Sequence, residues 1–218
     1  MKKQKQFAVI GLGKLGMAVA LELERIGHQV LAIDRNLARV DASAELFTHC
    51  VQADSTDAKA LRALGLHNMD GVVVAVGDLE SSIMITMLLK EQGVGFVCAK
   101  AGSDMHSKLL KKVGADKVVF PERDMGTRLA HSVANANITE VIELSGGCSI
   151  VELRVLPAWQ GKSLKELALR RTLGINVVGT KTDDNQMNLT PDPDRPLEAK
   201  EMLVIVGSDS AIAKLNEY

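Results

Sequence analysis

The chain has 218 residues, of which 46% are hydrophobic and 24% are charged, and its formal net charge is −1. A balance so close to zero gives no support for nucleic-acid binding through phosphate neutralisation, so nucleic acid is not an expected partner. No run approaches the roughly 20 apolar residues of a membrane-spanning helix. The 3 widely spaced cysteines indicate neither a disulfide framework nor a zinc site. We therefore expect a cytoplasmic protein with an aliphatic core.

The first 135 residues alternate short β-rich runs with amphipathic helical stretches. The expected strands cover residues 7–10, 30–33, 48–52, 71–76, 96–100 and 117–120. Helical patterns lie between them, for example at residues 15–26, 57–64, 79–91 and 104–113. Strands that alternate with helices form a parallel sheet covered on both faces, and right-handed crossovers make it doubly wound. The sequence therefore predicts a Rossmann-like α/β domain over residues 1–135.

A further helix is expected to begin near Glu122 and to continue toward Val141, with a break at residues 134–137, where two asparagines are weak helix formers. Strand-like runs follow at residues 149–156, 175–181 and 202–206, with helices at 163–168 and 208–215. Ser163 is the expected N-cap of the first of these helices, and Glu166 occupies the capping-box position. We expect a hinge or linker at residues 136–142 and a small α+β domain at residues 143–218.

A glycine-rich motif follows the first expected strand directly and opens the first helix. It reads Gly11-Leu12-Gly13-Lys14-Leu15-Gly16. In this context the first glycine allows a tight turn, the second lets the backbone approach a pyrophosphate, and the third lets the helix pack closely on the sheet. The phosphate then faces free amides at the helix N-terminus. Asp34 ends the second strand, where a carboxylate accepts hydrogen bonds from ribose hydroxyls. Together these features predict a nucleotide site.

Other candidate site residues follow the second to fifth strands, because ligands of such sheets bind at the carboxyl ends of the strands. They are Arg35, Asp54, Ser55, Val76, Gly77, Lys100, Ala101 and Gly102. Asp34 disfavours a 2′-phosphate through charge repulsion, which the neighbouring Arg35 softens. Two interpretations of residues 54–56 stay open: contact with the adenine or ribose, or an N-cap cluster for the next helix.

Lys14 and Glu122 each have two interpretations as well. Lys14 reaches a terminal phosphate as a point charge, or it is a solvated surface lysine. Glu122, which follows Pro121, binds a cation, or it stabilises its helix through the helix dipole. The 5 histidines show no metal-ligand spacing, and the sequence contains none of the common nucleophile or metalloprotease motifs. We therefore expect a nucleotide-binding protein that is not an enzyme.

Several stretches give the chain a resemblance to a known family. They include the run from Phe7 to Gly13, Gly114-Ala115-Asp116, and the run PERDMG that begins at Pro121. The chain resembles the RCK (or KTN) regulatory subunits of Trk/Ktr-type bacterial potassium-uptake systems, most of all the KtrA type, over both expected domains. This resemblance implies a homo-oligomer in which dimers assemble into an octameric ring. It also implies a peripheral location on the inner face of the cell membrane, through a membrane-embedded potassium-translocating subunit.

The resemblance also implies ligands. ATP and ADP, and in some members NAD(H), compete for the Rossmann site, and ATP activates while ADP inhibits. The position of Glu122 helps to bind a divalent cation, Mg²⁺ or Ca²⁺, near the terminal phosphates, and His106 contributes to the same cleft. The family commonly has Arg where this chain has Lys14, and Lys lacks bidentate phosphate geometry. In several members the C-terminal domain binds cyclic di-AMP, here at the positions of Arg170, Asn176 and Pro191.

Two alternatives stay open at this stage. One is an NAD(H)-binding redox sensor or an oxidoreductase, which turnover with candidate substrates would reveal. The other is the gating ring of a different potassium channel or of an antiporter, because RCK domains serve those proteins too.

Overall fold

The chain divides into two compact units, Met1–Glu122 and Arg123–Tyr218. The computed structural model describes residues 4–134, 137–144, 146–182, 184 and 186–217. Residues 135 and 136, which belong to the expected break and linker, lie outside the described residues. Each unit is a separate body with its own sheet and its own buried core.

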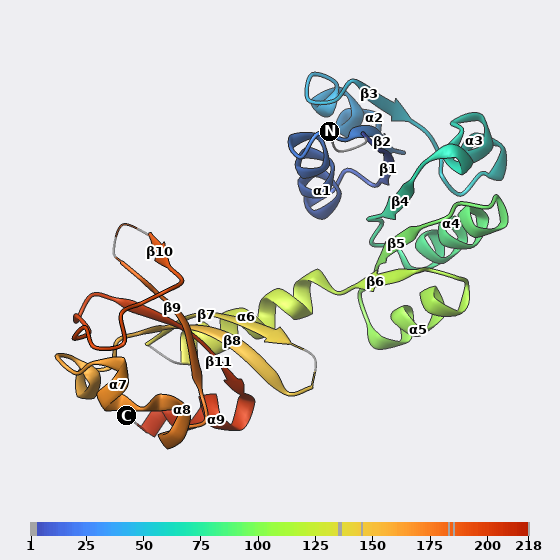
Figure 1. The fold of residues 1–218 in the computed structure, drawn as a ribbon. Helices are drawn as coiled ribbons and strands as arrows, with labels where there is room; N and C mark the ends of the chain where they lie inside the picture. Colours follow the sequence, from blue (N-terminus) through green and yellow to red (C-terminus); the bar gives the residue numbers. More distant parts are fainter. Residues whose placement is uncertain (1–3, 135–136, 145, 183, 185, 218) are drawn as a thin grey trace. The chain divides into compact units, whose positions relative to one another are not determined.

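The first unit is built on a parallel sheet with the strand order β3-β2-β1-β4-β5-β6 (Figure 1). Its strands are β1 (Gln6–Ile10), β2 (Gln29–Asp34), β3 (His49–Gln52), β4 (Gly71–Val74), β5 (Val97–Lys100) and β6 (Lys117–Val119). Its helices are α1 (Lys14–Arg25), α2 (Leu37–Ser43), α3 (Ala58–Ala63), α4 (Leu79–Glu91) and α5 (Asp104–Lys112), with the 3₁₀ turn η1 (Leu66–Asn68). The predicted Rossmann-like fold is confirmed. The strand order reverses between β1 and β4, so the loops that leave these two strands diverge and open a crevice.

The central strand β1 is buried on both of its faces. Ala8 and Ile10 pack into one core together with Leu89 of α4, whereas Val9 packs into a second core with Ala20 of α1. Successive side chains of a strand point to opposite faces of the sheet. An unbroken apolar run is therefore what a strand covered by helices on both sides requires.

The second unit is built on an antiparallel sheet with the strand order β10-β9-β11-β8-β7. Its strands are β7 (Ile138–Leu144), β8 (Cys148–Arg154), β9 (Asn176–Lys181), β10 (Met187–Asn188) and β11 (Met202–Ser208). Its helical elements are α6 (Pro121–Ala134), which starts in the first unit, η2 (Pro157–Trp159), α7 (Leu164–Leu167), α8 (Leu169–Thr172), α9 (Asp209–Ala213) and η3 (Lys214–Glu217). Leu153, Leu203 and Ile205 form the centre of its core, and each is at most 1% exposed.

The segment expected to be a linker differs most from the prediction. The helix α6 ends at Ala134 rather than continuing toward Val141, and residues from Ile138 onward form the edge strand β7. Ile138 and Val141 are both buried although they lie three residues apart, a spacing typical of a helix. The register of β7 against β8 shifts between Ile138 and Glu140, so a bulge brings the two side chains to the same face.

The capping box predicted for the short helix is confirmed. The Ser163 hydroxyl accepts a hydrogen bond from the amide of Glu166 at 3.2 Å, and the Glu166 carboxylate accepts one from the amide of Ser163 at 2.7 Å. We expect Ser163→Ala to lower the stability of the second unit by about 0.5–2 kcal/mol, since the amide of Glu166 loses its acceptor. Urea unfolding followed by the fluorescence of Trp159 measures this change. The matched control is Ser210→Ala, a serine that does not cap a helix, and an equal loss in both variants would contradict the capping role.

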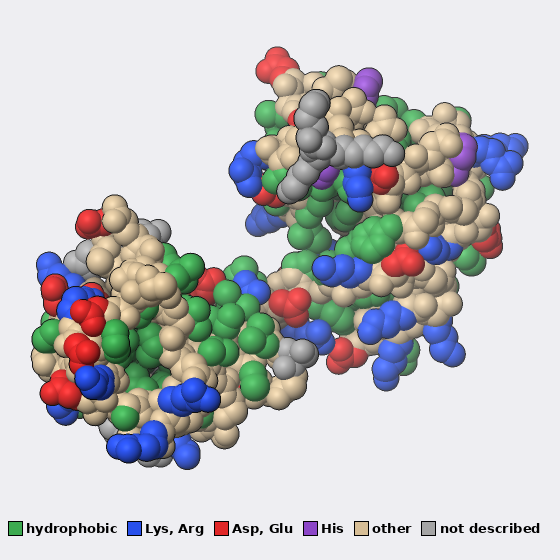
Figure 2. All heavy atoms as spheres, in the orientation of Figure 1, with side chains coloured by type: hydrophobic (Ala, Val, Ile, Leu, Met, Phe, Trp, Pro, Cys, Tyr) green, Lys and Arg blue, Asp and Glu red, His purple; other side chains and the backbone are tan. Residues whose placement is uncertain are grey.

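Three lysines cluster on one helix of the first unit. Lys108, Lys111 and Lys112 are exposed on α5, and Figure 2 shows blue side chains gathered over this helix. Lysines in the last turn of a helix also complement its dipole. Within the described residues, no helix is both long enough and apolar enough to cross a membrane.

Candidate functional site

The turn between β1 and α1 contains three glycines, and the geometry explains the presence of glycine differently at each of the three positions. Gly11 has a φ of +94°, and its amide donates to the carbonyl of Ile33 at 2.7 Å. A Cβ on Gly16 would lie 1.8 Å from the carbonyl oxygen of Gly11. Gly13, in contrast, has no heavy atom within 4 Å of the place of a Cβ, and as the N-cap of α1 it provides no side-chain cap. The turn therefore leaves the first amides of α1 beside open space, which is an arrangement that binds anions.

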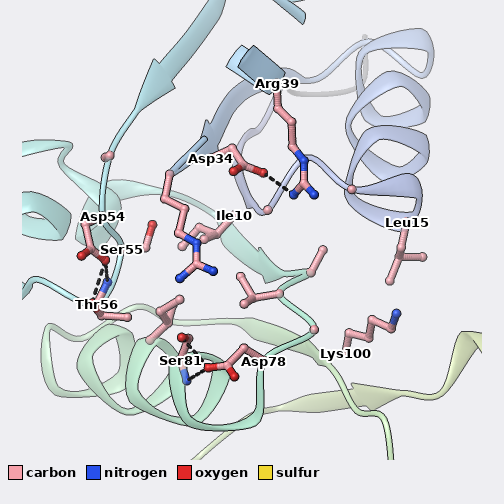
Figure 3. Close-up of a pocket in the computed structure, with 18 of the residues that line it drawn as sticks. Ile10, Leu15, Asp34, Arg39, Asp54, Ser55, Thr56, Asp78, Ser81 and Lys100 are labelled. Atoms are coloured by element: carbon pink, nitrogen blue, oxygen red, sulfur yellow. Dashed lines mark hydrogen bonds and ion pairs between the residues drawn. The ribbon is translucent and has the colours of Figure 1, made fainter. Parts of the chain in front are cut away.

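Asp34, at the end of β2, is held by three donors. Its carboxylate accepts hydrogen bonds from the amide of Leu12 at 2.7 Å and from the amide of Asn36 at 2.8 Å, and it pairs with Arg39 at 3.3 Å (Figure 3). Burial to 4% exposure opposes ionisation, but these donors outweigh it and hold the pKa of Asp34 below its usual range. An ionised carboxylate is thus fixed at the strand end, where it can accept from ribose hydroxyls.

A cleft of about 420 Å³ opens between the glycine turn, Asp34 and the ends of β3, β4 and β5 (Figure 3). This volume lies in the range of small-molecule sites. The expected site residues that line it are Gly11, Gly13, Lys14, Leu15, Asp34, Arg35, Asp54, Ser55, Val76, Gly77, Lys100 and Glu122. The structure therefore brings together residues that lie as far apart in the sequence as Gly11 and Glu122.

The other expected site residues do not line the cleft but belong to the segments that surround it. Leu12 offers its amide to Asp34, and Gly16 lies under the turn. Ala101 is 1% exposed. The amide of Gly102 donates to Nδ1 of His106 at 3.2 Å, and His106 is only 3% exposed. These residues shape the segments that line the cleft, and their own contact with a ligand stays a prediction.

The two interpretations of residues 54–56 are separated by the hydrogen bonds. The N-cap of α3 is Asp57, whose carboxylate accepts from the amide of Lys59 at 2.8 Å. Asp54 instead accepts from the amide and the hydroxyl of Thr56, at 2.9 and 2.7 Å. This turn does not cap the helix, and it lines the cleft.

Two polar residues of the cleft had no place in the sequence prediction. Arg39 comes from α2, whose start is marked by Asn36, the N-cap that accepts from the amide of Ala38. An Asn before an amphipathic stretch is a helix-start signal, and it predicts the helix that carries Arg39. It does not predict that Arg39 reaches the cleft. Ser81 lines the cleft at the start of α4, where its amide and hydroxyl donate to the N-cap residue Asp78.

Lys100 and Glu122 form an ion pair at one end of the cleft. The Nζ of Lys100 donates to Oε1 of Glu122 at 2.5 Å, and this hydrogen bond is the main reason that the pKa of Glu122 is lowered. Glu122 is 70% exposed in its side chain, whereas Lys100 is 21% exposed. Among the described residues, no three His, Cys, Asp or Glu side chains gather into a metal-binding group.

Comparison with known proteins assigns both units. The TrkA-N domain model matches residues 7–121, and the TrkA-C domain model matches residues 149–218. The Ktr system potassium uptake protein C of Bacillus subtilis is 37% identical over 98% of this chain and 97% of its own length. The Ktr system potassium uptake protein A of the same organism is 38% identical over 97% of this chain and 96% of its own.

Solved structures share the fold. The GsuK channel is 21% identical over 98% of this chain, with a TM-score of 0.72, and the aligned part is 39% of the GsuK chain. The structure described as the GsuK channel bound to NAD is 24% identical over 100% of this chain and 38% of its own, with a TM-score of 0.54.

Proposed function

The chain belongs to the TrkA-N/TrkA-C family that includes the Ktr potassium uptake proteins, and from this premise we propose that it is the nucleotide-binding regulatory subunit of a potassium-uptake system. It binds an adenine nucleotide in the cleft of the first unit and gates a membrane-embedded, potassium-translocating subunit. Its place is then cytoplasmic, at the inner face of the membrane. A ring assembled from dimers transmits the state of the nucleotide.

One observation carries the proposal: an open helix start and an ionised Asp34 face the same cleft. The amides at the start of α1 suit the phosphates, and Asp34 suits the ribose. Lys14, Lys100 and Arg35 also line the cleft and complement the charge of a nucleotide. ATP carries one phosphate more than ADP, so the two ligands differ at the phosphate end alone. We propose that ATP activates and ADP inhibits because only ATP reaches the end of the cleft.

Binding and potassium transport test this proposal together. Calorimetry with ATP, ADP and NADH identifies the preferred nucleotide, and light scattering measures the assembly with and without it. Rubidium uptake then compares cells that carry the membrane subunit alone with cells that also carry this chain. Binding of ATP and ADP, a nucleotide-dependent oligomer and stimulated uptake support the proposal. Turnover of NADH with a substrate would replace it with the oxidoreductase alternative.

Glu122 is proposed to bind a divalent cation together with the terminal phosphate of ATP. We expect Glu122→Gln to weaken ATP binding in the presence of Mg²⁺ or Ca²⁺ and to leave ADP binding nearly unchanged. Without the carboxylate, the added negative charge of the third phosphate has no bridging cation. Calorimetric titrations of both nucleotides, with and without the cation, measure the effect.

The control for Glu122 is Asp124→Asn, which removes a carboxylate from the first turn of the same helix but outside the cleft. If Glu122 serves only the dipole of its helix, both variants lose a few tenths of a kcal/mol of stability and bind both nucleotides as before. Equal loss of ATP and ADP binding in Glu122→Gln would also contradict the cation role.

The second unit has a hollow that is lined by two of the three residues expected to contact cyclic di-AMP. Its volume is about 440 Å³, and its lining includes Arg170 and Asn176 but not Pro191. A guanidinium suits a phosphodiester, and an amide side chain suits the edge of a base. We propose that this hollow binds part of the cyclic di-AMP molecule. Titration of cyclic di-AMP into wild type and into Arg170→Gln tests this proposal.

A further inference from the structure

His106 closes a buried chain of hydrogen bonds behind the cleft. Its Nδ1 accepts from the amide of Gly102 at 3.2 Å, and its Nε2 lies 2.7 Å from the hydroxyl of Ser82. That hydroxyl in turn donates to the carbonyl of Leu79 at 3.0 Å. His106 and Ser82 are at most 3% exposed. A backbone amide can only donate, so Nδ1 must be the acceptor, and a neutral ring then carries its proton on Nε2.

These hydrogen bonds connect two segments that line the cleft. The ring holds Gly102, which lies two residues after Lys100, and Lys100 pairs with Glu122 at the cleft end. Through Ser82 the ring also holds the start of α4, where Asp78 and Ser81 line the cleft. His106 does not line the cleft, so it can affect a ligand only through these segments.

Protonation would break the hydrogen bond that holds the loop. A second ring proton on Nδ1 would point at the amide of Gly102, so two donors would face each other. Burial disfavours this charged form and lowers the pKa of His106, while the charge of Asp78 acts in the opposite direction. The other charged residues on the packed elements are Glu80, Lys90 and Glu91 of α4, Lys100 at the end of β5, and Asp104, Lys108, Lys111 and Lys112 of α5 itself.

We propose that neutral His106 is a positioning residue that fixes residues 100–102 and the start of α4 around the phosphate end of the cleft, and that its protonation releases them and weakens nucleotide binding. This inference rests on the proposed nucleotide-binding function. Its consequence is an affinity that falls as the pH falls below the ordinary range of histidine.

The test uses the full-length protein and ADP at about pH 7.5 and about pH 5.5. His106→Asn keeps an acceptor near the place of Nδ1 but loses the hydrogen bond to Ser82, so we expect it to bind ADP more weakly than wild type at the higher pH; because it cannot titrate, its affinity should not show the additional fall of wild type at the lower pH. When the pH is lowered from about 7.5 to about 5.5, the ADP affinity of wild type should fall by a factor that is at least about threefold larger than the fall in the variant. The phosphates of ADP also titrate over this pH range, but they affect both proteins equally, so their effect cancels when the two losses of affinity are compared. His67→Gln, a change of an exposed histidine outside the cleft, should behave as wild type.

Each result has a distinct meaning. Equal pH dependence in wild type and His106→Asn overturns the inference and leaves the proposed function intact, whereas no ADP binding by wild type at the higher pH overturns both. If His106→Asn does not fold, NMR of the wild-type ring decides. A neutral ring protonated on Nε2 that loses the Gly102 hydrogen bond on acidification, together with a weakening of ADP binding over the same pH range, supports the inference. A ring protonated on Nδ1 overturns it.

Discussion

Gly16→Ala should destabilise the first unit by more than about 3 kcal/mol, whereas Gly13→Ala should cost at most about 1 kcal/mol and act on nucleotide binding instead. The added Cβ of residue 16 would lie 1.8 Å from a backbone oxygen, that of Gly11, and 3.2 Å from the Cβ of Ala75. Neither neighbour is the end of a flexible side chain, so α1 must move off the sheet. At residue 13 the methyl group enters open space, which is the space through which a phosphate approaches the amides.

The chain provides its own reference for this experiment. Its single tryptophan, Trp159, lies in the second unit and is 3% exposed. Urea unfolding followed by circular dichroism should therefore show a lower midpoint for the first unit in Gly16→Ala, while the tryptophan transition stays in place. Gly13→Ala should keep both transitions and lose ADP affinity. If both variants unfold like wild type and bind ADP equally well, the glycine turn has neither role.

The second large effect is expected at Asp34. Asp34→Asn should lower ADP affinity by roughly 10- to 150-fold, which corresponds to the loss of about one charge-assisted hydrogen bond to the ribose, about 1.5–3 kcal/mol. Asn rather than Ala is the informative substitution. Its carboxamide oxygen can still accept from one of the two amides that the carboxylate serves, those of Leu12 and Asn36, so that the strand end keeps part of its support. Isothermal titration calorimetry gives the affinity.

Asp57→Asn is the matched control for Asp34→Asn. Asp57 follows the next strand and caps α3, but it does not line the cleft, and Asn caps helices as well as Asp does. The control should bind ADP as wild type does. Unchanged affinity in Asp34→Asn would remove the ribose role of this carboxylate, even if the cleft itself binds nucleotides through the glycine turn.

The parts of the fold that the sequence predicts well are those with a local signal. The first strand, the glycine turn and Asp34 all follow from neighbouring residues, because turn geometry and strand ends depend on them. Strand β7 does not, since the bulge gives Ile138 and Val141 a helical spacing that only the pairing with β8 explains.

The candidate site shows the same limit. Gly102 and His106 lie in the segment after the fifth strand, which sequence patterns and family resemblance place at the cleft. Whether the ring of His106 faces the cleft or is buried behind it depends on Ser82, which is 24 residues away in the chain. Arg39 was missed for a related reason, since its partner Asp34 lies on another element and no motif links the two.

The positions of the cleft residues along the chain have a consequence for the synthesis of the protein. Residues that line the cleft extend from Ile10 to Glu122, and Glu122 is also the last residue of the first unit. A nascent chain that has left the ribosome only as far as β4 holds the glycine turn and Asp34, but it lacks the wall that β5 and Glu122 supply. On the proposed function, a nucleotide would therefore reach its full affinity only after the synthesis of the first unit is complete.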